Sequence, residues 1–207
     1  MSATKSPKKQ NKKKTSTSKP LTDSFLAGNK ICLRPIRASD INRKYLSWLN
    51  DAEVTRYLET GQFPVTKKDL EAFYIGIKKS KTDVMFAMIE KKTGSHIGNI
   101  KLGGINWIHR YADLGIMIGD KKYWGKGCGA AACMLLLEYA FNRLNLNKVF
   151  LGIYATHKHA IKTYQKAGFR IEGKLKNMLI IDGEYTDKVL MGILNSEYNK
   201  NIRKSKK

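Results

Sequence analysis

The sequence has 207 residues, three cysteines and a formal net charge of +22. No apolar run approaches the roughly 20 residues that span a bilayer, and the cysteines lack metal-ligand spacing, which argues against a membrane span or a zinc module. The length suits one domain with a real core, and the lysine-rich start lacks the apolar stretch of a secretory signal, which indicates a cytoplasmic protein.

Much of the positive charge lies at the two ends of the chain. Residues 2–20 hold seven lysines and no acid, and residues 200–207 hold five basic residues and no acid. We therefore expect a disordered lysine-rich tail over 1–28, one folded domain over 29–195 and a basic tail over 196–207. We favour the interpretation that the tails are simply solvated segments over the alternative that they tether the protein to an anionic surface. Contact with nucleic acid is expected only through them.

The apolar pattern predicts one strand, then helices, and then mainly strands. In chain order we expect a strand over 31–37, a helix over 40–50 after Ser39 as N-cap, a short segment over 55–58, a helix after Thr66, strands over 84–90, 95–106 and 111–119, a helix to about 144, a strand over 149–155, a helix over 157–167, and strands over 169–174, 178–181 and 185–194. Asp69 follows Thr66 by three residues, which is typical of a capping box.

The predicted strands indicate a mixed sheet. Three consecutive strands with short connections form an antiparallel meander, whereas the strand over 149–155 follows a crossover helix and should pair in parallel. Asp182-Gly183 is a strong hairpin signal. The expected fold class is α/β with mixed α+β order, and its central, mostly antiparallel sheet is flanked by helices.

A glycine-rich loop joins the third meander strand to its helix. Gly125, Gly127 and Gly129 lie in this loop with Lys126 between the first two. Free N–H groups and the positive end of the macrodipole at a helix start favour an anionic phosphate. The spacing is not that of a Walker loop, and the preceding meander argues against a dinucleotide fold.

Three passages, together with this order of elements, resemble the GNAT N-acyltransferase superfamily over about residues 29–195. They are Trp124-Gly125-Lys126-Gly127-Cys128-Gly129-Ala130, the helix and strand start from Ala160 through Tyr164 to Gly168-Phe169, and Trp48-Leu49-Asn50-Asp51 followed by residues 54–58. The branch is similar to ribosomal-protein N-terminal acetyltransferases. Trp124 stands where the family often has Gln or Arg.

The resemblance implies acetyl-CoA as co-substrate, no metal, and acyl transfer from a thioester to an amine. It implies cofactor contacts from the third meander strand, the loop and the start of a later helix, at Ile116, Met117, Ile118, Trp124, Gly125, Lys126, Gly127, Cys128, Gly129, Ala130 and His157. His157 departs from the family's usual Asn, so its role is carried over only loosely.

The resemblance places Tyr164 as the acid that protonates the coenzyme A thiolate, and Asp113 as a candidate base. Each also has a structural interpretation, as a core tyrosine and as a strand-end acid paired with a lysine. Glu90 and His109 are weaker candidates for the base. Cys128 lies at a helix start, which lowers a thiol pKa, but a small residue in a crowded loop is favoured over a covalent nucleophile.

The acceptor amine is left open. An amino sugar on a nucleotide is favoured, with a protein N-terminus as alternative and a non-catalytic acyl-CoA sensor as a third possibility. Polyamines are disfavoured by a core of about +10, although local acids could override that. Four aromatic residues could line the acceptor cleft or simply be core: Trp48, Tyr57, Phe63 and Tyr74. A monomer or homodimer is expected, and His96 and His159 form no metal constellation.

Overall fold

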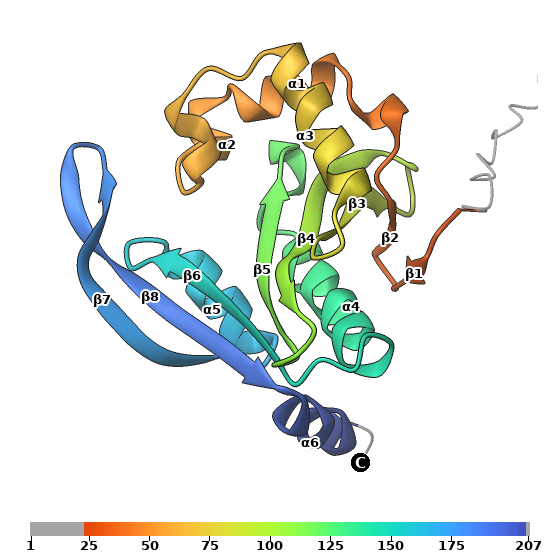
Figure 1. The fold of residues 1–207 in the computed structure, drawn as a ribbon, viewed down its shortest axis with the longest axis vertical. Helices are drawn as coiled ribbons and strands as arrows, with labels where there is room; N and C mark the ends of the chain where they lie inside the picture. Colours follow the sequence, from red (N-terminus) through yellow and green to blue (C-terminus); the bar gives the residue numbers. More distant parts are fainter. Residues whose placement is uncertain (1–22, 206–207) are drawn as a thin grey trace, which may run out of the picture.

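The computed structural model describes residues 23–205, and the side chains as far as residue 200. Eight strands form one sheet in the order β1-β2-β3-β4-β5-β6-β8-β7, with helices on both faces (Figure 1). The strands are β1 Leu26–Ala27, β2 Ile31–Pro35, β3 Val84–Glu90, β4 His96–Asn106, β5 Tyr111–Ile118, β6 Lys148–Tyr154, β7 Arg170–Ile181 and β8 Glu184–Leu194. All neighbours pair antiparallel except β5 and β6, which are parallel. The mixed, mostly antiparallel sheet is therefore confirmed.

Six α-helices and three 3-10 turns complete the described chain. They are η1 Ala38–Asp40, α1 Arg43–Leu49, α2 Ala52–Thr55, η2 Glu59–Gln62, α3 Lys67–Lys79, η3 Lys121–Tyr123, α4 Cys128–Asn142, α5 Lys158–Lys166 and α6 Asn195–Ser205. No helix within residues 23–205 is long and apolar enough to cross a bilayer.

The two larger of three buried apolar clusters in the described chain cover opposite faces of the sheet. The larger packs α4 and α5 against one face, where Leu136, Leu137 and Leu151 are almost fully buried. The smaller packs α1 and α3 against the other face around Trp48 and Leu70. Because side chains alternate along a strand, every strand residue faces either the α4–α5 side or the α1–α3 side.

Turn chemistry explains where several elements end. Gly168 adopts a φ of 100° and stops α5, as predicted. Asp182 and Gly183 have φ values of 52° and 82°, so both central residues of the β7–β8 hairpin are left-handed, as a type I′ turn requires. Thr66 and Asp69 form the predicted capping box at the start of α3.

The predicted N-cap at Ser39 is wrong. Asn42 caps α1 instead, and its side chain accepts hydrogen bonds from the N–H groups of Lys44 and Tyr45 at 3.0 and 3.1 Å. Asp40 turns inward to the N–H of Arg37 and closes a 3-10 turn, which delays the helix by three residues.

Three further boundaries differ from those predicted. The short helix comes earlier, at α2, because the side chain of Asp51 accepts from the N–H groups of Glu53 and Val54. Strand β7 is continuous, with bulges where a break was predicted. Beyond residue 195 the chain forms α6, whose Tyr198 is buried against Phe141 of α4 with ring centroids 5.2 Å apart. The predicted N-terminal tail over 1–28 is also too long, because β1 pairs with β2 and buries Leu26. Residues 1–22 and 206–207, which hold most of the predicted tails, lie outside the described residues.

Candidate active site

The two parallel strands diverge after a short contact. Strands β5 and β6 pair only at Tyr111 with Lys148, Ala112 with Val149, and Asp113 with Phe150. Residues 114–118 of β5 and 151–154 of β6 have no partner across this gap, and Figure 1 shows the strands spreading apart. The free backbone edge of β5 can pair with an extended ligand as an added strand would. The predicted cofactor residues Ile116, Met117 and Ile118 lie on that edge.

The glycine loop opens α4 beside this gap. Gly125 and Gly127 adopt φ values of 69° and 78°, and no side chain caps the helix at Gly127. The first intrahelical bond in this turn runs from the N–H of Ala131 to the carbonyl of Gly127, which leaves the earlier N–H groups of α4 for an anion. Gly125, Lys126 and Gly127 are exposed, so a phosphate can reach them.

Two side-chain hydrogen bonds hold the loop, one from a lysine and one from a tryptophan. The Nζ of Lys30 donates to the carbonyl oxygen of Lys126 at 3.1 Å, a contact that the sequence did not predict. The indole Nε1 of Trp124 donates to the carbonyl oxygen of Ile118 at 2.7 Å. The donor of Trp124 is thus used inside the protein, so this residue braces the loop rather than supplying the polar group usual at its position.

Tyr164 is buried on α5, where its ring meets Phe169 edge-on at a centroid distance of 5.6 Å. Burial raises the pKa of Tyr164, and the charges of Cys133 and Asp113 add to the rise. The phenol is therefore protonated at neutral pH, the state that a general acid needs.

Asp113 stands at the point where β5 and β6 part. Its neighbours Ala112 and Leu114 face the α4–α5 core, so its own side chain lies on the α1–α3 face. The residue is exposed by its accessible surface, yet the protein around the carboxyl desolvates it enough to raise the pKa of Asp113, while Lys101 and Lys188 act to lower it and Glu59 acts to raise it. A raised pKa suits a base, and the gap separates this carboxyl from Tyr164 on the opposite face.

His157 joins two parts of the chain that lie far apart in sequence. Its ring stacks on Tyr57 at a centroid distance of 3.9 Å, and Tyr57 also meets Tyr154 edge-on at 5.6 Å. Burial, and then the charge of His159, lower the pKa of His157, so the ring is neutral at pH 7. It precedes α5 without capping it by its side chain.

The other aromatic residues proposed for the cleft are placed differently. Trp48 and Tyr74 belong to the smaller core, whereas Phe63 is 80% exposed. Among the four, only Tyr57 packs at the β6–α5 junction beside the gap.

The weaker chemical candidates have structural roles. Glu90 closes the β3–β4 turn by accepting from the N–H groups of Lys92 and Thr93. His109 lies parallel to Tyr111 at a centroid distance of 6.4 Å.

Burial raises the pKa of Cys128 despite Lys30 and Lys126 nearby, so the expected lowering by the helix start is wrong. Within the described residues no group of three or more His, Cys, Asp or Glu could hold a metal.

Comparison with known proteins settles the family. Residues 30–170 match the family model described as the acetyltransferase (GNAT) domain. The chain belongs to the GNAT acetyltransferase family. It is therefore an acetyl-CoA-dependent N-acetyltransferase, and the free N–H groups of α4 and the open edge of β5 fit that co-substrate.

Relatives of this GNAT chain include enzymes with different acceptors. It is 31% identical over 175 residues to the spermidine N1-acetyltransferase of Escherichia coli (strain K12), covering 83% of this chain and 90% of the relative. It is 33% identical over 105 residues to a putative ribosomal N-acetyltransferase of Bacillus subtilis (strain 168), covering 51% and 57%. A solved spermidine N-acetyltransferase of Vibrio cholerae, in complex with CoA and spermine, superposes with a TM-score of 0.76 at 28% identity, covering 83% and 99%.

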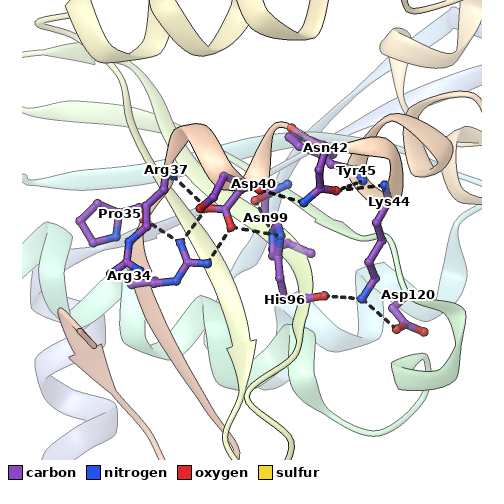
Figure 2. Close-up of polar contacts among 12 residues, drawn as sticks. Arg34, Pro35, Arg37, Asp40, Asn42, Lys44, Tyr45, His96, Asn99 and Asp120 are labelled. Atoms are coloured by element: carbon purple, nitrogen blue, oxygen red, sulfur yellow. Dashed lines mark hydrogen bonds and ion pairs between the residues drawn. The ribbon is translucent and has the colours of Figure 1, made fainter. Parts of the chain in front are cut away.

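The sequence did not predict a buried polar network that lies under α1 of the GNAT domain (Figure 2). Arg34 donates twice to Asp40, at 2.6 and 2.7 Å, and Asp40 is only 5% exposed. Burial acts to raise the pKa of Asp40, but Arg34 and the N–H of Arg37 outweigh it and hold the pKa below its ordinary value. His96 Nε2 lies 3.0 Å from both Gly98 O and Asn99 Oδ1, which assigns the ring proton to Nε2.

The network continues to the glycine loop. The Nζ of Lys44 donates to the carbonyl oxygen of His96 at 2.8 Å and lies 3.5 Å from Asp120 (Figure 2). Lys121, the next residue, contacts Asp51 at 2.9 Å and Glu53 at 2.6 Å. The segment before the loop is thus tied to both α1 and α2. The sequence shows these charged residues, but it does not show which of them pair across different elements.

Proposed function

We propose that the chain acetylates the primary amine of a small molecule by direct attack on the acetyl thioester. The observation that carries this proposal is the gap between β5 and β6, which has Asp113 on one face and Tyr164 on the other. An amine approaching from the α1–α3 face meets the carboxyl first, and the thioester lies between it and the phenol.

The residues divide the proton transfers. Asp113, directly or through water, takes the proton that the amine loses as its nitrogen bonds to the carbonyl carbon. The carbon–sulfur bond then breaks, and Tyr164 gives its proton to the departing thiolate. A backbone N–H on the free edge of β5 stabilises the oxyanion. The products are the N-acetylated amine and coenzyme A.

A polyamine is the first acceptor class. Its support is the relationship to the Escherichia coli and Vibrio cholerae enzymes, whose names specify spermidine, and which this chain matches over most of their length. Asp113 and Glu59 offer negative charge beside the gap. The expectation from net charge alone disfavoured this class, because net charge averages over surfaces that the acceptor does not touch.

An amine that also carries an anionic group is the second class, and an amino sugar on a nucleotide is one example. The specific observation is that Lys101 and Lys188 both act on Asp113. A polycation would meet repulsion there, whereas a phosphate or carboxylate would be attracted.

The proposal is tested by release of coenzyme A from acetyl-CoA. Purified full-length protein is given spermidine, spermine, UDP-glucosamine, glucosamine 6-phosphate and peptides with free N-termini, and thiol release is followed over time. We expect turnover with at least one small amine above that with any peptide. Tight acetyl-CoA binding without turnover of any amine would favour a sensor, and preference for the peptides would favour a protein N-terminal acetyltransferase.

A further inference from the structure

The floor of the site on the α1–α3 face contains an open position on β6. Val149, Leu151 and Ile153 are buried in the α4–α5 core, so Phe150, Gly152 and Tyr154 point to the other face. Gly152 is exposed, so a side chain from a neighbouring strand can cross β6 there.

Lys188 fills that space. It lies on β8 opposite Tyr154, yet a Cβ placed on Gly152 would overlap its Cε and come within 3.3 Å of its Nζ. Gly152 is two residues from Phe150, which pairs with Asp113. The lysine therefore runs across β6 toward the carboxyl, and only glycine at 152 permits this path.

The ammonium group of Lys188 is held without a carboxylate partner. Within residues 23–200, no Asp or Glu oxygen lies within 4.0 Å of its Nζ, although the residue is half-buried. Lys101, the other lysine acting on Asp113, reaches Asp83 at 4.0 Å. A half-buried lysine gives up hydration and side-chain freedom, and an anionic ligand would restore the lost contacts.

We propose that Lys188 determines acceptor specificity by binding an anionic group of the acceptor, a carboxylate or phosphate, while the amine of the same molecule reaches Asp113. The inference rests on the proposed function and chooses between its two acceptor classes. It predicts that an amine with a negative group is a better acceptor than the same amine without it, and that a polycation is disfavoured.

Matched acceptor pairs test the proposal. Glucosamine is compared with glucosamine 6-phosphate and UDP-glucosamine, and cadaverine with lysine, each with saturating acetyl-CoA. We expect the best anionic member to exceed its neutral or cationic partner in kcat/KM by about 10- to 100-fold, the range of a charge-assisted hydrogen bond. The phosphate and carboxylate arms identify which anion is bound.

Two substitutions isolate the lysine. Lys188→Met should reduce that ratio to near one and leave acetyl-CoA affinity unchanged, and Lys188→Arg should retain part of the preference. The ratio is the readout, because Lys188 also acts on the pKa of Asp113 and its loss can change the rate with both acceptors. Gly152→Ala should give the same loss with the charge still present, because the methyl group occupies the path of Lys188. Lys174→Met is the matched control, since Lys174 pairs with Val189 and so lies on the opposite face.

The outcomes separate the two proposals. Spermidine or cadaverine turned over as well as the anionic partners would overturn the role of Lys188 while leaving the small-amine activity standing. A ratio that Lys188→Met leaves unchanged would also overturn it, because the lysine would then affect both members of a pair alike and would not bind the anionic group. No turnover of any amine would instead overturn the proposed function.

Discussion

The phenol of Tyr164 is the residue on which the proposed chemistry depends most directly. Among the described residues its hydroxyl has no side-chain hydrogen-bond partner, and its ring is held by apolar packing and by Phe169. Removing the oxygen therefore changes the chemistry with little change in the packing around it.

Tyr164→Phe should lower turnover by about 100- to 10,000-fold, the range expected for loss of a general acid. The affinity for acetyl-CoA and the melting temperature should change little. Steady-state kinetics, calorimetric binding and a thermal scan measure the three quantities. Turnover equal to that of the unmodified protein would remove Tyr164 from the mechanism.

His96 makes the stability of the protein depend on pH. Burial lowers its pKa, and the charge of Arg34 acts in the same direction, while Asn99, Asp40 and the carbonyl of Gly98 oppose it. A histidine with a lowered pKa binds its proton more readily in the unfolded chain. Its contribution to the free energy of unfolding is thus present above about pH 6.5 and lost as pH falls toward the lowered value.

The melting temperature should accordingly fall between pH 7.5 and 5.5, and His96→Gln should show a smaller fall. Because the pKa of His157 is also lowered, the variant should keep part of the dependence. Identical slopes for the two proteins would show that His96 does not titrate with unfolding.

At the scale of elements, helix α1 is pressed against the end of β5. A Cβ placed on Gly119 would overlap the indole of Trp48, which is 6% exposed. Gly119 directly follows β5, so the same contact positions the free strand edge relative to the acceptor side.

Gly119→Ala should lower the free energy of unfolding by about 1–3 kcal/mol, the usual cost of overpacking a core. The matched control is Gly76→Ala, in the interior of α3, where a Cβ meets nothing within 4 Å. That change should stabilise the protein by about 0.5–1 kcal/mol because alanine is the better helix former. Chemical denaturation measures both, and a neutral Gly119→Ala would mean that α1 shifts freely.

Local signals predicted the elements better than the contacts between them. The meander, the glycine loop and the Asp182-Gly183 turn follow from patterns within a few residues. The path of Lys188 across Gly152 joins positions on different strands, and the Arg34–Asp40 pair with His96 joins three elements, so neither has a local signature. Ser39 does not cap α1, because Asp40 binds Arg34 and the N–H of Arg37, and the helix begins only after Asn42. The roles of Tyr164 and Asp113 came from the family resemblance and stay predictions.

For the whole molecule, the basic N-terminal tail is expected to be separate from small-amine chemistry. The described sheet begins at Leu26, which is buried in the larger core. Removing residues 1–20 takes away seven lysines and no acid. Turnover of the preferred small amine should remain within about twofold, and a collapse of activity in the truncated protein would place the tail in the site.

The short β5–β6 contact divides the sheet into two halves joined by three residue pairs. Acetyl-CoA bound along β5 would act as a missing strand, so the co-substrate would complete the fold as well as take part in the reaction. At a concentration of about 100 times its Kd it should stabilise the protein by about 2.7 kcal/mol. Hydrogen–deuterium exchange should slow most at the amides of residues 114–118 that point away from β4. Uniform slowing over all strands would instead indicate that the ligand only stabilises the fold globally.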